Sequence, residues 1–188
     1  MIFDPRKVSA HVPVIMGDNE IEQVGSYKYL GVQLDNQLKW NTQVDSLCSK
    51  LAQRLHFLRR LRLFGVSSKI MLTFYNAVLG SLIRYGIAAW FGPLTVQNKS
   101  KIEKMVKNAM KVIGIKNYPS LQSTFEQCVI KQSYRILDDS SHILHPEYEL
   151  LPSGRRYRAV RFKSNRYKLS FLPTSIALLN KKPAQSKT

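Results

Sequence analysis

The sequence predicts a mainly α-helical (α+β) fold: an N-terminal β-hairpin and strand, then a helical bundle, then a basic, loop-rich C-terminal arm. Three observations support this. Residues 12–35 combine short apolar runs with turn residues, and residues 41–113 repeat apolar positions at helical spacing. Beyond residue 139 the periodicity stops and proline, glycine and basic residues follow. We expect three parts, residues 1–40, 41–138 and 139–188, in a chain of 188 residues that is long enough to bury a core.

The β-rich start contains two patterns. The run VPVIM at 12–16 is followed by the turn Gly17-Asp18-Asn19 and then by residues 20–24, which predicts a hairpin. Residues 27–35, YKYLGVQLD, predict one short strand that bends at Gly31, where the missing side chain lets another backbone approach.

Two helices are expected next. Asn41 is a candidate N-cap for a helix to about Phe64, and Gly65 ends it. Its apolar face comprises Val44, Leu47, Leu51, Leu55 and Leu58. Ser67 is the candidate cap of a helix over 68–91, in which Gly80 and Gly86 should mark close crossings by another element. Its inward stripe is predicted to be Ile70, Phe74, Ala77, Val78, Ser81, Leu82, Tyr85 and Ala89.

A third helix should run from a Thr95 cap to Ile113 and end at Gly114. One side of it is apolar, and the other carries lysines with no acid among them. A fourth helix is expected over about 119–138 and a short one over 173–180, with disorder over 181–188.

Charge predicts a polyanionic partner. The chain has 29 basic and 12 acidic residues, a net charge of +17. Residues 1–40 hold four basic and five acidic residues, whereas residues 41–188 hold 25 and seven. We therefore expect RNA or DNA to bind after residue 40. The candidate residues in the helices are Arg54, Arg59, Arg60, Arg62, Lys101, Lys104, Lys107 and Lys111. A solvated surface is the alternative for the lysines.

The C-terminal arm, residues 155–168, mixes cations with aromatic rings. It has seven basic residues and no acid, a composition typical of single-strand binding. Its candidate residues are Arg155, Arg156, Tyr157, Arg158, Arg161, Phe162, Lys163, Arg166, Tyr167 and Lys168. The alternative is that the rings anchor the arm to the bundle while the charges are solvated.

Cellular location and membrane insertion can be judged from a few features. Cys48 and Cys128 are far apart and fit free thiols in a reducing compartment. The start, MIFDPRK, lacks a signal peptide. Residues 70–91 are apolar, but Arg84 and the helical periodicity argue against a membrane span. We expect an intracellular protein, nuclear or cytoplasmic.

No enzyme is predicted. Five acids precede residue 40 and form no catalytic pair: Asp4, Asp18, Glu20, Glu22 and Asp35. His142-x-x-His145 lacks further ligands at zinc spacing, and Asp138-Asp139 fits a helix end better than a magnesium site. No phosphate-binding glycine loop or nucleophile motif occurs. We expect no catalytic residue, no metal and no cofactor.

Three blocks resemble the reverse transcriptases of LINE-type non-LTR retrotransposons. Residues 27–35 resemble motif E, the primer grip, and the following helices carry RLHFLRRLRLFG at 54–65, Phe74-Tyr75 and AAWFG at 88–92. LLPSGRRYR at 150–158 is similar to the region after the thumb. The resemblance implies an end of palm over 1–40, with motif D in 1–10, and a thumb-like bundle over 41–138.

By this resemblance the primer grip would be Tyr27, Lys28, Tyr29, Leu30 and Gly31. The family's palm carboxylates, which hold two metals, have no counterpart here. The implied function is a non-catalytic fragment that keeps sequence-independent RNA or DNA binding, with the missing fingers and palm as a further partner. A decayed insertion without selected function is the alternative.

Residues 14–60 show a second resemblance, to a short domain family found with AlkB-homologue tRNA-modifying proteins. That family would imply a 2-oxoglutarate dioxygenase or a methyltransferase. The chain has no H-x-D iron motif and no nucleotide-binding loop, so the catalytic part of this interpretation is not supported by its residues.

Overall fold

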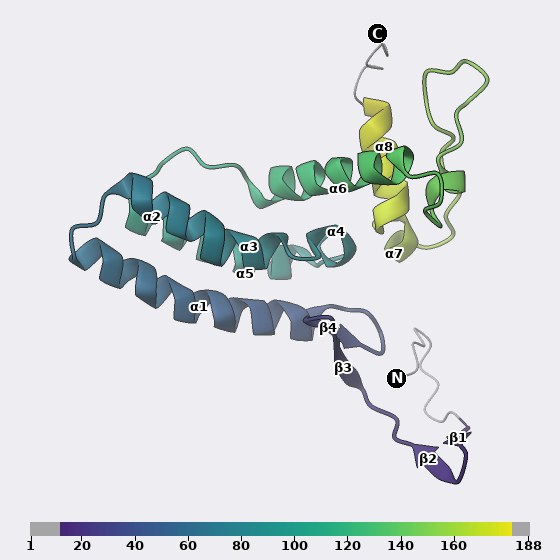
Figure 1. Cartoon of the computed structure of the whole chain (residues 1–188), viewed down its shortest axis with the longest axis horizontal. Helices are drawn as coiled ribbons and strands as arrows, with labels where there is room; N and C mark the ends of the chain where they lie inside the picture. Colours follow the sequence, from purple (N-terminus) through teal and green to yellow (C-terminus); the bar gives the residue numbers. More distant parts are fainter. Residues whose placement is uncertain (1–11, 182–188) are drawn as a thin grey trace.

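The computed structural model describes residues 12–181 and confirms the mainly α (α+β) class, with β-hairpins before a helical bundle (Figure 1). The predictions for residues 1–10 and 182–188 lie outside this range. Two antiparallel hairpins are present, formed by β1 Val14–Met16 with β2 Asn19–Ile21, and by β3 Ser26–Tyr29 with β4 Val32–Asp35.

The second hairpin corrects the prediction of a single strand over residues 27–35. Leu30 and Gly31 form a two-residue turn with φ of 45° and 83°, and Tyr29 pairs with Val32. Two successive positive φ angles match the hand of a tight hairpin turn. Gly31 therefore reverses the chain here, where a bend within one strand was expected.

An aspartate organises the entry into the first helix, α1 Asn41–Leu63. The N–H groups of Gln37 and Lys39 donate to Oδ1 of Asp35 at 3.0 Å, and that of Trp40 donates to Oδ2 at 2.9 Å. The predicted Asn41 cap is wrong, because Trp40 occupies the cap position without a side-chain hydrogen bond. Asn41 instead accepts a hydrogen bond from Nδ2 of Asn98 at 2.7 Å.

The apolar face of α1 is confirmed. Its predicted members are all buried: Val44, Leu47, Leu51, Leu55 and Leu58. Gly65 has a φ of 72° and follows the C-cap Phe64, as predicted for the helix end.

The single helix predicted over 68–91 is broken into α2 Ser68–Phe74, a π-helical segment Tyr75–Leu79, α3 Gly80–Arg84 and α4 Ile87–Trp90. The helix is interrupted at Tyr85, whose ψ is 114°, and at Gly86, whose φ is 61°. Tyr85 faces outward, where its hydroxyl donates to the carbonyl oxygen of Leu30 at 2.6 Å. Ser67 is at the N-cap position of α2 but makes no cap hydrogen bond through its side chain.

The prediction of which side of this helical segment faces the core was wrong. Ile70 is 62% exposed and Tyr85 is 56% exposed. The buried residues recur mostly every fourth position: Met71, Tyr75, Leu79, Ile83, Ile87 and Trp90. A four-residue repeat drifts around an α-helix, and the wider π turn reduces that drift.

The two glycines of the segment differ. Gly86 lies beside β4, but a Cβ there would be at ordinary contact distance, 3.6 Å from Cγ2 of Val32, so its positive φ of 61° favours glycine more than a close crossing does. At Gly80 the atoms nearest to a Cβ belong to the guanidinium of Arg84, at 3.1 Å, so the closest approach comes from a flexible side chain of the same helix.

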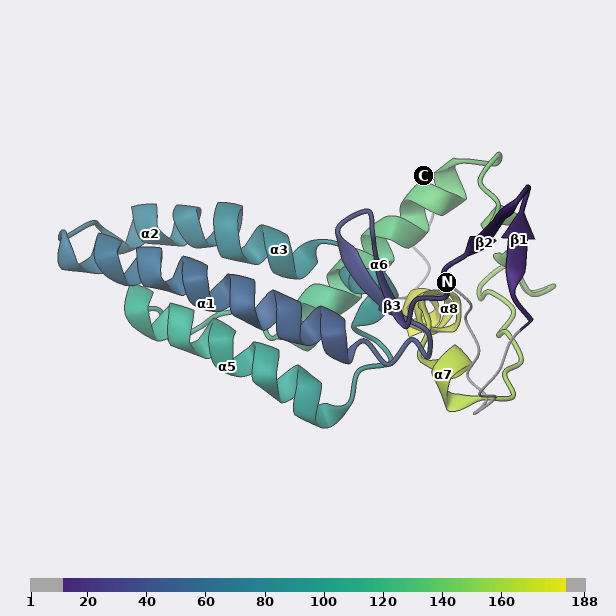
Figure 2. The same cartoon turned by 90° about the horizontal axis from the view of Figure 1, so that it is seen from below.

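Two long helices complete the bundle. The helix α5 Val96–Ile113 begins at the predicted Thr95 cap, which accepts from the Asn98 N–H at 3.2 Å, and ends at Gly114. The helix α6 Leu121–Asp138 follows a linker over 115–120. In Figure 2 α1 lies between the α2–α3 segment and α5. Among residues 12–181 no helix combines the length and apolar character needed to cross a membrane.

The C-terminal segment packs on the end of α6 through a small core of its own. A 3₁₀ turn His145–Glu147, α7 Asn165–Lys168 and α8 Phe171–Lys181 are its regular elements. Ile136 of α6 meets Tyr148, Leu172 and Ile176 in this core. The terminal helix is thus slightly longer than the predicted 173–180.

Candidate nucleic-acid interface

The four predicted lysines of α5 are exposed along one side of the helix. Lys101 to Lys111 spans about 15 Å of helix axis at 1.5 Å per residue. Acids accompany them: Nζ of Lys101 is 3.2 Å from Oδ1 of Asp45, and Nζ of Lys107 is 4.0 Å from Oε1 of Glu103. The prediction of an acid-free side is therefore wrong, because Glu103 is one turn from Lys107 and Asp45 of α1 reaches across.

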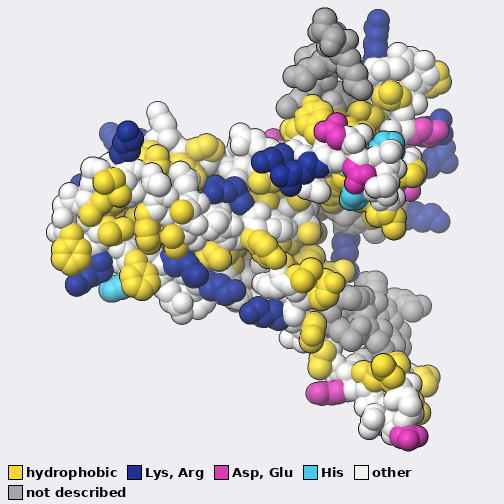
Figure 3. Space-filling model, viewed as in Figure 1, with side chains coloured by type: hydrophobic (Ala, Val, Ile, Leu, Met, Phe, Trp, Pro, Cys, Tyr) yellow, Lys and Arg dark blue, Asp and Glu magenta, His cyan; other side chains and the backbone are white. Residues whose placement is uncertain are grey.

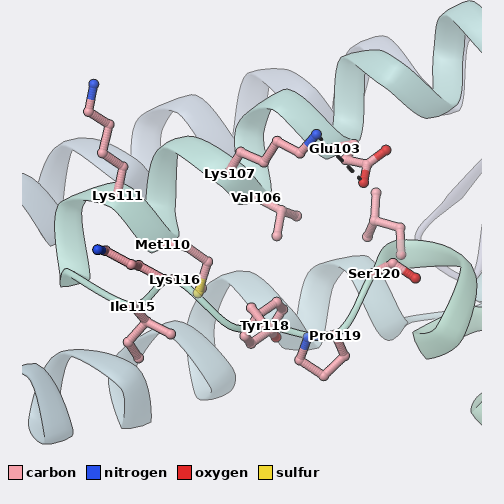
Figure 4. A pocket seen from close by; sticks show the side chains of 11 residues that line it. Glu103, Val106, Lys107, Met110, Lys111, Ile115, Lys116, Tyr118, Pro119 and Ser120 are labelled. Atoms are coloured by element: carbon pink, nitrogen blue, oxygen red, sulfur yellow. Dashed lines mark ion pairs between the residues drawn. The ribbon is translucent and has the colours of Figure 1, made fainter.

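A groove of about 370 Å³ lies between α5 and the linker (Figure 4). Apolar side chains form its floor: Val106, Met110, Ile115, Tyr118 and Pro119. Lys107, Lys111 and Lys116 border it, with Glu103 as the one carboxylate among the described residues that line it. Burial, followed by a side-chain hydrogen bond with Tyr118, raises the pKa of Tyr75. The two rings meet edge-on, 5.3 Å apart between centroids.

Lys116 and Tyr118 were missed in the sequence. They lie outside any periodic segment, and their position beside α5 follows from the chain reversal at Gly114, whose φ is 87°. The sequence signal that could have identified them is the helix stop at Gly114 followed closely by Lys116. This arrangement can place ammonium groups against phosphates while apolar atoms contact sugars or bases.

The α1 arginines form a second group, near the C-terminal end of that helix. Arg54 is half-buried, whereas Arg59, Arg60 and Arg62 are exposed. The guanidinium carbon of Arg60 is 5.4 Å from the centroid of the Phe64 ring. Arg54 and Arg60 line a groove that shares no residue with the α5–linker groove.

The arm cations form a third group. All seven are exposed: Arg155, Arg156, Arg158, Arg161, Lys163, Arg166 and Lys168. Nε of Arg158 is 3.2 Å from Oε2 of Glu149, which neutralises part of the charge. Phe162 and Tyr167 are 47% and 40% exposed, and Nζ of Lys168 is 5.5 Å from the Phe162 centroid.

Tyr157 differs from the other two rings because it is held by the C-terminal core. Its N–H donates to Oδ1 of Asn180 at 2.8 Å, and Nδ2 of Asn180 donates to its carbonyl oxygen at 3.0 Å. Its ring meets Tyr148 edge-on, 6.0 Å between centroids, and burial raises its pKa. Tyr157 is therefore an anchor, and only two of the three predicted rings are free to stack.

We expect substitutions of these three rings to have different effects on RNA binding and on stability. Phe162→Ala with Tyr167→Ala should weaken single-stranded RNA binding by about 1–3 kcal/mol for each ring that stacks on a base, with an unchanged melting temperature. Tyr157→Ala should lower the melting temperature instead. Fluorescence anisotropy with a labelled oligouridine and differential scanning fluorimetry measure both. Unchanged RNA affinity in the folded double variant would show that these rings do not stack on bases.

The residues of the β3–β4 hairpin lie apart from the α1 arginines. Tyr27, Tyr29 and Leu30 are 57%, 59% and 73% exposed, and Lys28 pairs with Gln33 in the hairpin register. The hairpin packs at the start of α1, and the arginines lie about 20–32 Å from that end of the helix at 1.5 Å per residue. The structure does not bring these two groups together.

The histidines and acids of the 138–145 loop serve local turns. Oδ1 of Asp139 accepts from the N–H and the hydroxyl of Ser141, and these hydrogen bonds hold its pKa below the usual range. Nδ1 of His142 accepts from the Leu144 N–H at 3.0 Å. Within residues 12–181 no three His, Cys, Asp or Glu side chains are grouped to hold a metal ion.

Residues 40–81 match the family model of alkylated DNA repair protein alkB homolog 8, N-terminal. The matched segment runs from the start of α1 into α3. No curated protein and no solved structure matches the chain. The match starts later than the 14–60 region predicted for this resemblance and excludes both hairpins.

The predicted resemblance to LINE-type reverse transcriptases is contradicted, because the family match is to a different protein family and no comparison points to a reverse transcriptase. The motif that supported it, an aromatic-Lys-aromatic-Leu-Gly run, also fits a tight hairpin turn held by Tyr85. Short motifs of this kind recur in unrelated folds. The predicted primer-grip role of residues 27–31 and the predicted partnership with a missing palm rested on this resemblance and are therefore also withdrawn.

Proposed function

We propose that this chain is a non-catalytic nucleic-acid-binding protein that contacts phosphates without sequence preference. The observation that carries this proposal is the cationic side of α5 with the adjoining α5–linker groove. Five lysines lie there, four from the helix and Lys116 from the linker, against Asp45 and Glu103. Lysine contacts of this kind position nucleic acid rather than read its bases.

Two further features support the proposal. Arg59 and Arg62 belong to the segment that matches the N-terminal model of alkB homolog 8, which is described as an alkylated DNA repair protein and so as one that acts on nucleic acid. The match is to an N-terminal region of that family. We assign binding to residues 41–138 and an accessory role to the segment after 139.

A charge-removal variant tests the proposal. Lys104→Gln, Lys107→Gln and Lys111→Gln together should reduce the slope of log affinity against log salt by about 2.7, or 0.9 for each duplex phosphate that these lysines no longer neutralise. Anisotropy titrations with a labelled 20-base-pair duplex at several salt concentrations measure this slope.

The matched control removes the same charge elsewhere, through Lys39→Gln, Lys69→Gln and Lys131→Gln, all residues outside α5. It should keep nearly the parental slope. Equal reductions in both variants would indicate an unlocalised effect of net charge and would reject the α5 site.

A further inference from the structure

A second groove, of about 880 Å³, lies between α1 and the α2–π segment. Leu61, Phe74 and Val78 form a half-buried floor, and the rings of Phe57 and Phe64 stand beside it, 58% and 72% exposed. Figure 3 shows hydrophobic side chains gathered over this end of the bundle, among Lys and Arg. An exposed apolar surface of this kind, with polar residues around it, is typical of an interaction site.

The rim of this α1–α2 groove is cationic. Arg54, His56 and Arg60 line it together with Gln53, and no carboxylate is among the described residues that do so. Arg60 stacks on Phe64, and His56 meets Phe57 edge-on at 6.0 Å between centroids. The groove therefore combines an apolar floor with positive charge on its edges.

The spacing along α1 gives the shape of an occupant. Phe57, Leu61 and Phe64 are related as i, i+4 and i+7, and Phe74 and Val78 oppose them as i and i+4. Residues 53–64 extend over about 16 Å at 1.5 Å per residue, which is three helical turns. Two antiparallel helices with apolar residues in this pattern form a groove for a third helix.

We infer that the α1–α2 groove docks an acidic amphipathic helix of another protein, about three turns long, with its apolar stripe on Leu61 and Val78. Its carboxylates would pair with Arg54 and Arg60, which gives the charge complementarity that favours a partner of opposite sign. A second copy of the chain would bring another +17 to the contact. Charge thus opposes self-association.

Nucleic acid is the competing occupant, since cations and rings are also the features of a stacking platform. The geometry favours a helix. The floor is mostly apolar and concave, and Arg60 already covers the Phe64 ring. This inference goes beyond the proposed function, and all the groove residues lie within the segment 40–81 that matches alkB homolog 8.

The test uses the full chain and a panel of fluorescein-labelled 15-residue peptides. Each peptide has Leu, Met or Trp at i, i+3, i+4 and i+7 and Glu elsewhere, and each is paired with a scrambled peptide of the same composition. At least one amphipathic peptide should bind about ten times more tightly than its scrambled partner. Phe57→Ala with Phe64→Ala should weaken that binding at least about tenfold. Arg60→Gln should weaken it and reduce its salt dependence.

The matched controls are Leu63→Ala and Arg59→Gln, exposed neighbours on α1 that do not line the groove. Both should leave peptide affinity within about twofold of the parent. Circular dichroism checks that every variant keeps its helix content. If no amphipathic peptide exceeds its scrambled partner, the inference is overturned.

Two other outcomes also overturn it. In the first, a labelled oligouridine binds the parent and competes with the peptide. If the Phe57/Phe64 variant also loses affinity for the oligouridine to the same degree as for the peptide, the groove is a nucleic-acid site. The other is a dimer by analytical ultracentrifugation that the same variant abolishes. The α5 lysine variant separates the two proposals, because it should weaken duplex binding and keep peptide binding.

Discussion

Replacing Gly92 with alanine is expected to destabilise the protein by about 3 kcal/mol or more, because among the described glycines it is the one where an added Cβ would overlap a backbone atom. For a domain of this size that lowers the melting temperature by about 6–12 °C. A Cβ at Gly92 would overlap the carbonyl oxygen of Leu169 and would be 3.5 Å from Cζ of Phe125. A backbone oxygen cannot rotate away as a flexible side chain can, so the two segments must separate.

This close approach joins the bundle to the C-terminal segment. Gly92 follows α4, Phe125 belongs to α6, and Leu169 lies between α7 and α8. The ammonium of Lys99 contacts the same place: it donates to the Gly92 carbonyl at 3.4 Å and is 4.8 Å from the Phe91 centroid, and burial lowers its pKa. The alanine variant should therefore loosen residues after 139 first.

The measurement is thermal unfolding by circular dichroism, combined with limited proteolysis to locate the loosened part. Gly25→Ala is the control, because a Cβ there meets no atom within 4 Å and its φ is not positive. It should leave the melting temperature within about 2 °C, since surface changes are usually within 0.5 kcal/mol. A Gly92→Ala variant that melts like Gly25→Ala would contradict the close approach.

The parts of the fold that the sequence predicts well are those set by local signals. Thr95, an amphipathic repeat and Gly114 define α5, and each acts within a few residues of the helix end it controls. The same holds for α1, whose leucine face and Gly65 stop need no knowledge of distant residues.

The parts that fail depend on contacts between distant residues. The helix breaks at Tyr85, whose hydroxyl donates to the carbonyl oxygen of Leu30, 55 residues earlier in the chain. The π segment adapts the helix to a four-residue repeat of buried side chains. Asp35 displaces Asn41 from the expected cap through hydrogen bonds to a loop. Propensity cannot report either effect, because tertiary packing overrides it.

The candidate site shows the same division. Charge is additive along the chain, so its concentration after residue 40 is visible in the sequence. Which rings are free is not visible, because Tyr157 is fixed by Asn180, 23 residues away. The α1–α2 groove also needs the fold, since the predicted stripe assigned Phe74 and Val78 to the inside together with the exposed Ile70.

Nucleic-acid affinity should fall by about 10³–10⁵ between 50 and 200 mM salt if the chain contacts six to ten phosphates. Six to ten phosphate contacts are feasible, because α5 and its linker together carry five lysines and the arm carries seven cations. Counterion release is the cause: each phosphate that a protein cation neutralises frees condensed ions into solution, and added salt opposes that release.

The measurement is an anisotropy titration of two labelled duplexes of unrelated sequence, each prepared as DNA and as RNA, at about 50, 100 and 200 mM salt. Both sequences and both RNA and DNA duplexes should give similar affinities, because the contacts are to phosphates. Replacing chloride by glutamate at fixed ionic strength checks for specific anion effects. Absence of binding at the lowest salt concentration, or an affinity that does not change with salt, would reject the proposed function, since a site built from lysines against phosphates cannot be insensitive to counterions.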